Sequence, residues 1–367
     1  MFKIAIDKNR VYGLDILRAF AILFVVIGHG NKLLPQKIAG NIYPFLLDGV
    51  GLFFVLSGFL IGGILLRTLE KEGKSSRLLF NFWIRRWFRT LPNYFLILII
   101  LSLLCLFFKD GFALADIARY FVFSQNLFYH HAVWFFPEAW SLSVEEWFYL
   151  LVPVLIFGSA YIFRIKNAFL FTATGIILAI TLFRFYRYTT ITIHNAIDWD
   201  IFFRTQVVTR VDSLMYGMVG AYLLFYYKRS WIKYKRTLFF IGILLLVTSK
   251  FFEPVLSAKP GLYYCVFSFS INSLATLLLL PLLSELKQGK GFVFTTITYL
   301  SLVSYSMYLL NFTIVQGWML NKLDFSSLMP YDTIVKYLLY WLLTISLSIM
   351  LYKYYELPMM KLRDKIK

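Results

Sequence analysis

The sequence contains few charged residues, few histidines and almost no cysteine. Only 15% of its 367 residues are charged, whereas a soluble globular domain carries about 25%. The two cysteines, Cys105 and Cys265, lie inside apolar stretches, which argues against a disulfide framework. Because no zinc-like spacing of His or Cys is present, we expect no bound metal. The chain also lacks polar linkers and alternating segments of about ten residues, which argues against separate soluble domains and a membrane β-barrel.

Hydrophobic residues make up 60% of the chain, and they gather in long stretches. A helix needs about 20 apolar residues to cross a membrane. The sequence therefore predicts an all-α, multi-pass membrane bundle of about ten transmembrane helices, forming one domain over residues 1–367. The ninth stretch is long enough to contain a break or a strong tilt. The predicted spans are residues 12–30, 44–66, 91–108, 140–163, 168–183, 207–227, 237–252, 262–284, 292–320 and 334–352.

The formal net charge of +18 is compatible with two explanations. One is binding to nucleic acid, which requires basic residues clustered on a soluble face. The other is the positive-inside bias of membrane proteins, in which Lys and Arg gather in cytoplasmic loops. When the predicted spans alternate across the membrane, 24 of the 37 Lys and Arg residues fall on one side. We therefore expect both termini in the cytoplasm and no nucleic-acid partner.

Two ionisable residues share one face of the first predicted helix. Arg18 and His29 are eleven positions apart, so they differ by about 20° around the helix and by about 16 Å along it. Ionisable groups inside a membrane helix are costly and indicate function by default. Arg18, near the cytoplasmic end, and His29, near the outer end, would then face one groove. The alternative is that Arg18 reaches the inner interface and His29 caps the outer one.

A pair of carboxylates enters the fourth predicted helix. Glu145 and Glu146 fall within its first two turns, on the outer side. At that depth, a carboxylate level with His29 would orient the imidazole ring and raise its basicity. Acidic residues in a first turn are also favoured by the helix dipole, without any catalytic role. Both glutamates are candidates for the inward-facing position.

A pair of arginines precedes the third predicted span. Arg86 and Arg89 are three positions apart and share a helical face. Because guanidinium groups bind phosphate in a bidentate manner, this pair predicts a phosphate site at the cytoplasmic mouth. Ordinary positive-inside charge is the alternative, and we favour it for the neighbouring Arg85.

Other features have simpler interpretations. Arg210 and Asp212, early in the sixth span, are expected to neutralise each other. Glycines of the second span, including Gly49 and Gly58, allow helices to approach closely. Aromatic residues at the outer mouth suit stacking on sugar rings, although an interfacial aromatic belt is the favoured explanation. These aromatic residues are Trp134, Phe135, Phe136 and Trp140.

Taken together, these motifs resemble the acyltransferase-3 family of membrane acyltransferases, which O-acetylate sugars of bacterial envelopes. The resemblance covers essentially the whole chain. Its strongest element is Trp-Ser-Leu-Ser-Val-Glu-Glu-Trp-Phe-Tyr at residues 140–149, and the Arg18 to His29 spacing fits the Arg-x10-His pattern of the family. The further matches are residues 49–60, Arg86-x-x-Arg89, Arg210-Val-Asp212, residues 304–309 and Glu356-x-Pro358.

The resemblance implies a membrane-bound O-acyltransferase of the bacterial cytoplasmic membrane. Its acyl donor would be acetyl-CoA, and its acceptor a glycan or lipid-linked sugar within reach of the membrane lipid. His29 would deprotonate the acceptor hydroxyl or carry the acetyl group itself, with Glu145 or Glu146 orienting the ring. The residues implied to bind the CoA phosphates are Arg18, Arg86 and Arg89.

The sequence departs from the family pattern at two places. Many members carry a histidine where this sequence has Asn311, which can hydrogen-bond but cannot relay a proton. Some relatives append an esterase-like domain, whereas this chain stops at Lys367. We therefore expect transfer to be completed by the membrane domain or a separate partner.

Two other classes of membrane protein remain possible. A transporter or flippase for a glycan or acylated lipid would also place polar residues around a central cavity, but the inverted repeats common in transporters are not visible. A channel is the other class, and the scattered acidic residues offer it no ring.

Overall fold

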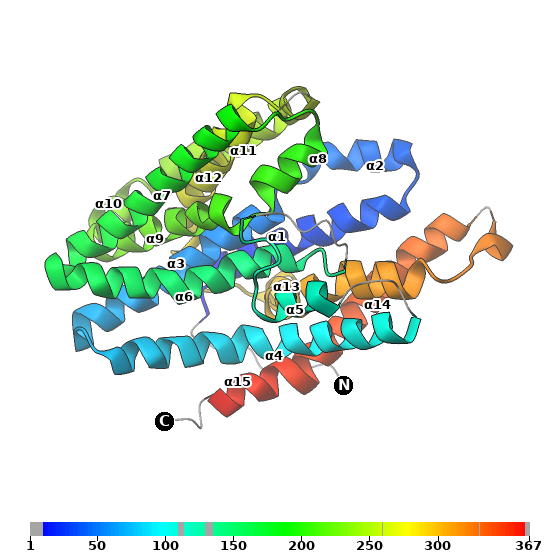
Figure 1. Cartoon of the computed structure of the whole chain (residues 1–367), viewed down its shortest axis with the longest axis horizontal. Coiled ribbons are helices and arrows are strands. Elements are labelled where there is room, and N and C mark those ends of the chain that lie inside the picture. Colours follow the sequence, from blue (N-terminus) through cyan, green and yellow to red (C-terminus); the bar gives the residue numbers. More distant parts are fainter. Residues whose placement is uncertain (1–9, 109–113, 129–134, 259, 330, 364–367) are drawn as a thin grey trace.

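A computed structural model describes residues 10–108, 114–128, 135–258, 260–329 and 331–363. The described chain is a bundle of helices (Figure 1), which confirms the predicted all-α class. The α-helices are α1 (Tyr12–Gly30), α2 (Gln36–Ile42), α3 (Gly49–Glu72), α4 (Ser76–Phe108), α5 (Leu114–Phe121), α6 (Ala139–Ile162), α7 (Ile165–Thr190), α8 (Ala196–Trp199), α9 (Val211–Tyr226), α10 (Lys228–Lys233), α11 (Lys235–Ala258), α12 (Ser268–Leu283), α13 (Gly291–Leu310), α14 (Asp332–Leu351) and α15 (Leu357–Arg363).

Short segments of other helical types connect or continue these helices. The π-helical segments are η3 (Asp200–Arg204), η5 (Tyr263–Phe267), η6 (Asn311–Leu320) and η8 (Tyr352–Glu356). The 3₁₀ segments are η1 (Asn31–Leu33), η2 (Tyr43–Phe45), η4 (Val207–Thr209) and η7 (Ser326–Leu328).

The prediction of about ten transmembrane helices is confirmed in its essentials. Within the described residues, nine helical stretches are long and apolar enough to cross a membrane, and α9 is a tenth apolar helix of only 16 residues. The third span differs most from its predicted bounds, because α4 begins at Ser76 and includes both Arg86 and Arg89. A helix of 33 residues is about 50 Å long, longer than a hydrocarbon core of about 30 Å. The cytoplasmic location of the termini stays a prediction.

The short helix α9 packs most extensively against α3, in the interior of the bundle. α1 contacts α3 on one side and α13 on another, while α15 lies along α4 at one edge of the molecule (Figure 1). Glycines allow the close approach of α3 and α9. A Cβ atom on Gly58 would lie 1.9 Å from the carbonyl oxygen of Leu214, and one on Gly217 would lie 2.0 Å from that of Val55. This contact confirms the predicted role of Gly58 in helix packing.

Replacement of Gly58 by alanine is expected to destabilise the bundle. The added methyl group has no space unless α3 and α9 separate, and overpacking of this kind costs about 1–3 kcal/mol or more. We expect the melting temperature of the purified protein to fall by about 5 °C or more. Gly175→Ala in α7 is the matched control, because its Cβ atom would meet no atom within 4 Å. Equal melting temperatures for the two variants would contradict the proposed contact.

The long ninth predicted span is one continuous helical stretch, Gly291–Leu320, that changes helix type within it. The α-helical part α13 ends at Leu310, and the chain continues through the π-helical segment η6 from Asn311. A π-helical turn is wider than an α-helical one and often marks a functional site. The change of helix type begins at Asn311, the position where this sequence has an asparagine in place of a histidine.

Candidate functional site

Two cavities lie one after the other within the bundle and meet at Val50 and Tyr308. The larger cavity has a volume of about 890 Å³, and His29 is among the residues that line it. The smaller cavity has a volume of about 110 Å³ and is lined by Arg18. Because both residues belong to the continuous helix α1, this helix runs along both cavities. Arg18 and His29 thus line two different cavities that share Val50 and Tyr308, and one groove common to both residues stays a prediction.

Asn311 holds the ring of His29. The Nδ1 atom of His29 lies 2.6 Å from Asn311 Oδ1. The Nδ2 atom of Asn311 donates to the carbonyl oxygens of Met307 and Tyr308, so its oxygen must face the imidazole. An amide oxygen only accepts hydrogen bonds, and the neutral ring must therefore carry its proton on Nδ1. This leaves the lone pair on Nε2, the state required of a base or a nucleophile.

Other contacts fix the position of this pair. The ring of His29 stacks on Phe312 with centroids 4.5 Å apart, and Lys32 Nζ lies 4.4 Å from the centroid of Phe312. The hydroxyl of Tyr340 donates to the carbonyl oxygen of Val26 and lies 3.3 Å from Asn311 Oδ1. The imidazole is thereby held between α1, the start of η6 and α14.

Glu138 is a carboxylate of the large cavity that the sequence prediction missed. It accepts hydrogen bonds from the backbone nitrogen of Thr313, at 3.1 Å, and from Thr313 Oγ1, at 2.5 Å. Burial raises the pKa of Glu138 to about 7, despite these bonds from Thr313. The sequence did offer one indication of its role, because Glu138 immediately precedes α6 and the motif at residues 140–149.

The small cavity brings together the three predicted arginines. Arg18 comes from α1, and Arg86 and Arg89 come from α4. The Nε atom of Arg86 is buried without a hydrogen-bond partner. Guanidinium groups gathered around unfilled space provide the donors and the charge that a phosphate requires.

Neither of the two predicted glutamates lines the cavity that contains His29. Glu145 lines the small cavity, beside Ser57 and Tyr149, and Glu146 accepts a 2.7 Å hydrogen bond from Thr90. Seven residues along α6 separate Glu145 from Glu138, an axial distance of about 10 Å. Glu138 is a carboxylate that lines the same cavity as His29, and the imidazole is hydrogen-bonded to Asn311. The orienting role of Glu145 or Glu146 stays a prediction.

The expected pair of Arg210 and Asp212 is wrong. Asp212 Oδ2 lies 2.6 Å from Arg184 Nη2, and both side chains are fully buried. Arg210 instead faces Asp48, with 3.4 Å between Arg210 Nη2 and Asp48 Oδ2. Residues two positions apart at a helix start point in different directions. Asp212 therefore pairs with Arg184 of α7, and Arg210 with Asp48, which immediately precedes α3.

The aromatic residues of the predicted outer mouth divide between core and cavity. Phe135 and Phe136 are buried, which is not the position of an interfacial belt. Trp140 lines the large cavity, and the guanidinium carbon of Arg204 lies 5.1 Å from the centroid of its ring. Trp134 lies outside the described residues.

Comparison with known proteins identifies relatives for most of the chain. Residues 11–353 match the model of the acyltransferase-3 family, described as an acyltransferase domain. The chain is also similar to the O-acetyltransferase OatA of Staphylococcus aureus strain NCTC 8325, with 31% identity over 225 residues that cover 58% of this chain and 34% of the relative. The OatA protein of strain COL matches to the same extent. The match thus spans about a third of the length of these relatives. No solved structure matches the chain significantly.

Proposed function

The chain belongs to the acyltransferase-3 family, and on this premise we propose that it transfers an acetyl group from cytoplasmic acetyl-CoA to a hydroxyl of an envelope glycan or lipid-linked sugar. The observation that carries the proposal is the arrangement of the two cavities. One contains a histidine with a fixed tautomer, and the adjoining one contains three arginines. The names of the relatives, O-acetyltransferases, support acetyl as the group transferred.

The small cavity is proposed to bind the donor. Arg86 and Arg89 would hold phosphates of CoA through charge-assisted hydrogen bonds, and Arg18 would add a third positive charge. The pantetheine arm would then pass Val50 and Tyr308, where the cavities meet. The axial distance between Arg18 and His29, about 16 Å, is the length that this arm would have to bridge.

The reaction is proposed to take place at His29. Its Nε2 atom removes the proton of the acceptor hydroxyl while the hydroxyl oxygen attacks the thioester carbonyl carbon. The carbon–sulfur bond then breaks, and the CoA thiolate leaves and takes up the proton from the imidazole. Alternatively, Nε2 attacks the thioester carbonyl carbon first, and the carbon–sulfur bond breaks to release the CoA thiolate. The acceptor hydroxyl then attacks the acetyl carbon, the bond to Nε2 breaks, and the hydroxyl proton passes to the thiolate. Asn311 serves both routes, because it keeps the proton on Nδ1.

The large cavity is proposed to receive the acceptor. It combines aromatic rings, among them Trp140 and Trp199, with polar side chains. The amide oxygens of Gln125 and Asn126 are buried there without hydrogen-bond partners. Buried polar atoms are rarely left unpaired, and the hydroxyl groups of a sugar would supply the missing donors. A volume of about 890 Å³ is at the upper end of ordinary ligand pockets.

The proposal is tested by measuring thiol release from acetyl-CoA by the purified protein, with and without envelope glycan from its own cell. We expect release to depend on the acceptor, and surface glycan of a deletion strain to lack acetyl groups on mass analysis. Absence of acceptor-dependent release by correctly folded protein would contradict acetyl transfer and favour transport.

A further inference from the structure

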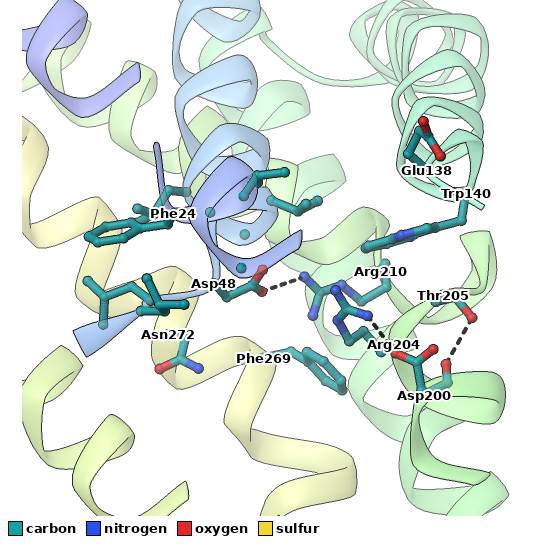
Figure 2. Close-up of a pocket in the computed structure, with 18 of the residues that line it drawn as sticks. Phe24, Asp48, Glu138, Trp140, Asp200, Arg204, Thr205, Arg210, Phe269 and Asn272 are labelled. Carbon is teal, nitrogen blue, oxygen red and sulfur yellow. Dashed lines mark hydrogen bonds and ion pairs between the residues drawn. The ribbon is translucent and has the colours of Figure 1, made fainter. Parts of the chain in front are cut away.

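A second group of charged residues lies in the large cavity, at the end formed by α3, η3 and the start of α9. Arg204 and Arg210 face Asp48 and Asp200 there (Figure 2), and the acetyl transfer proposed above uses none of them. Arg204 Nη1 lies 2.5 Å from Asp200 Oδ1. The guanidinium carbon of Arg210 lies 4.3 Å from the centroid of Phe269.

Arg210 is an incompletely paired buried cation. Only 1% of its side chain is exposed, and its Nε and Nη1 atoms have no hydrogen-bond partner. Its contact with Asp48, 3.4 Å long, is at the far limit of a hydrogen bond. A buried guanidinium group whose N–H donors lack acceptors is destabilising, so an additional acceptor at this position would complete the site.

The charges around this end of the cavity favour an anion. Arg204 lines the cavity, and 33% of its side chain is exposed although Nη1 is paired with Asp200. Lys32 adds a third cation near Arg204, whereas the carboxylates that face these cations are Asp48 and Asp200. Asp212 also lies near Arg210, but it is paired with Arg184. Glu138, which also lies near Lys32, is engaged by Thr313. Lys250 and Glu253, which also line the cavity, pair with each other.

We propose that the acceptor carries a negatively charged group, a carboxylate or a phosphate, and that Arg210 and Arg204 bind it in the large cavity. The acceptor is then an acidic sugar or a sugar phosphate. Two guanidinium groups recognise either anion through paired hydrogen bonds. This binding would place the remainder of the sugar between Trp140 and His29, both of which line the same cavity. The inference rests on the proposed function, because it specifies the acceptor of that reaction.

A binding experiment tests the inference without requiring acetyl transfer. The purified protein is titrated with methyl glucuronide, glucose 1-phosphate and the neutral methyl glucoside, and tryptophan fluorescence reports binding through Trp140 and its neighbours. We expect at least one anionic probe to bind about tenfold more tightly than the neutral one. The probe that gains affinity distinguishes a carboxylate from a phosphate.

Variants of Arg204 and Arg210 test whether these two residues cause the preference for the anionic probe. Arg204→Gln, and Arg210→Lys, which keeps the charge that faces Asp48, should each reduce the preference for the anionic probe to below about threefold. Lys250→Gln is the matched control, because it removes one positive charge from the same cavity and should leave the preference unchanged. Equal binding of all three probes, or no binding of any, would overturn the inference. So would an equal loss of preference in the control. Thiol release from acetyl-CoA can persist after any of these outcomes. Failure of the anionic-acceptor inference is therefore distinct from failure of the proposed acetyl transfer.

Discussion

His29→Ala is expected to lower the rate of acetyl transfer by at least about a hundredfold. A positioned general base contributes about 10²–10⁴ to a rate, and a covalent carrier would contribute more. His29 lines the large cavity, and its Nδ1 atom is bound to Asn311, which leaves the lone pair on Nε2. The measurement is initial-rate thiol release at saturating acetyl-CoA, with the amount of folded protein determined by size-exclusion chromatography.

His194→Ala is the matched control for this variant. His194 is exposed and its backbone nitrogen bonds Asp198, so its side chain can be removed without disturbing either cavity. We expect this control to retain normal activity. A rate close to that of the unchanged protein in His29→Ala would show that the imidazole takes no part in the transfer.

Arg86→Ala and Arg89→Ala are each expected to raise the KM for acetyl-CoA by about tenfold to a hundredfold. A hydrogen bond to a charged group contributes about 1.5–3 kcal/mol, and each 1.4 kcal/mol corresponds to a factor of ten. The effect should be smaller or absent with S-acetylpantetheine, because this donor lacks the phosphates. The measurement is therefore the ratio of the two KM values for each variant.

Arg85→Ala provides the control for the arginine variants. Arg85 adjoins Arg86 in α4 but is exposed, whereas Arg86 and Arg89 line the small cavity. Its loss removes the same charge and should leave the KM for acetyl-CoA unchanged. If Arg86→Ala raised the KM for acetyl-CoA and for S-acetylpantetheine by the same factor, phosphate binding would be contradicted and a structural role indicated.

Hydropathy predicted the number and approximate place of the helices because each span must be apolar over its own length. It placed the start of the third span too late, since the charged residues before Pro92 lower the hydropathy of α4 without interrupting its helix. It also predicted a span at residues 207–227, where the described α-helix has only 16 residues. Such a helix is about 24 Å long, and its place between α3 and α12 could not be read from its own composition.

Relations within one helix were predictable, whereas relations between helices were not. The common face of Arg18 and His29, and that of Arg86 and Arg89, follow from 3.6 residues per turn. The hydrogen bond between His29 and Asn311 joins residues 282 positions apart, and depends on how far one helix is displaced along another. For the same reason the sequence assigned Asp212 to Arg210, and the partners Arg184 and Asp48 emerged only from the packed structure.

The contact between the two cavities has an electrical consequence for the cell. One elementary charge that crosses 100 mV releases about 2.3 kcal/mol, so an open water-filled path through the bundle would discharge the membrane. The cavities meet at apolar Val50 and at Tyr308, whose hydroxyl is held 2.6 Å from Ser141 Oγ and 2.9 Å from the carbonyl oxygen of Glu138. A hydrated ion would have to shed water to pass this contact, whereas a slender, uncharged pantetheine arm would not. We expect the same two side chains to admit the donor and to keep the membrane insulated.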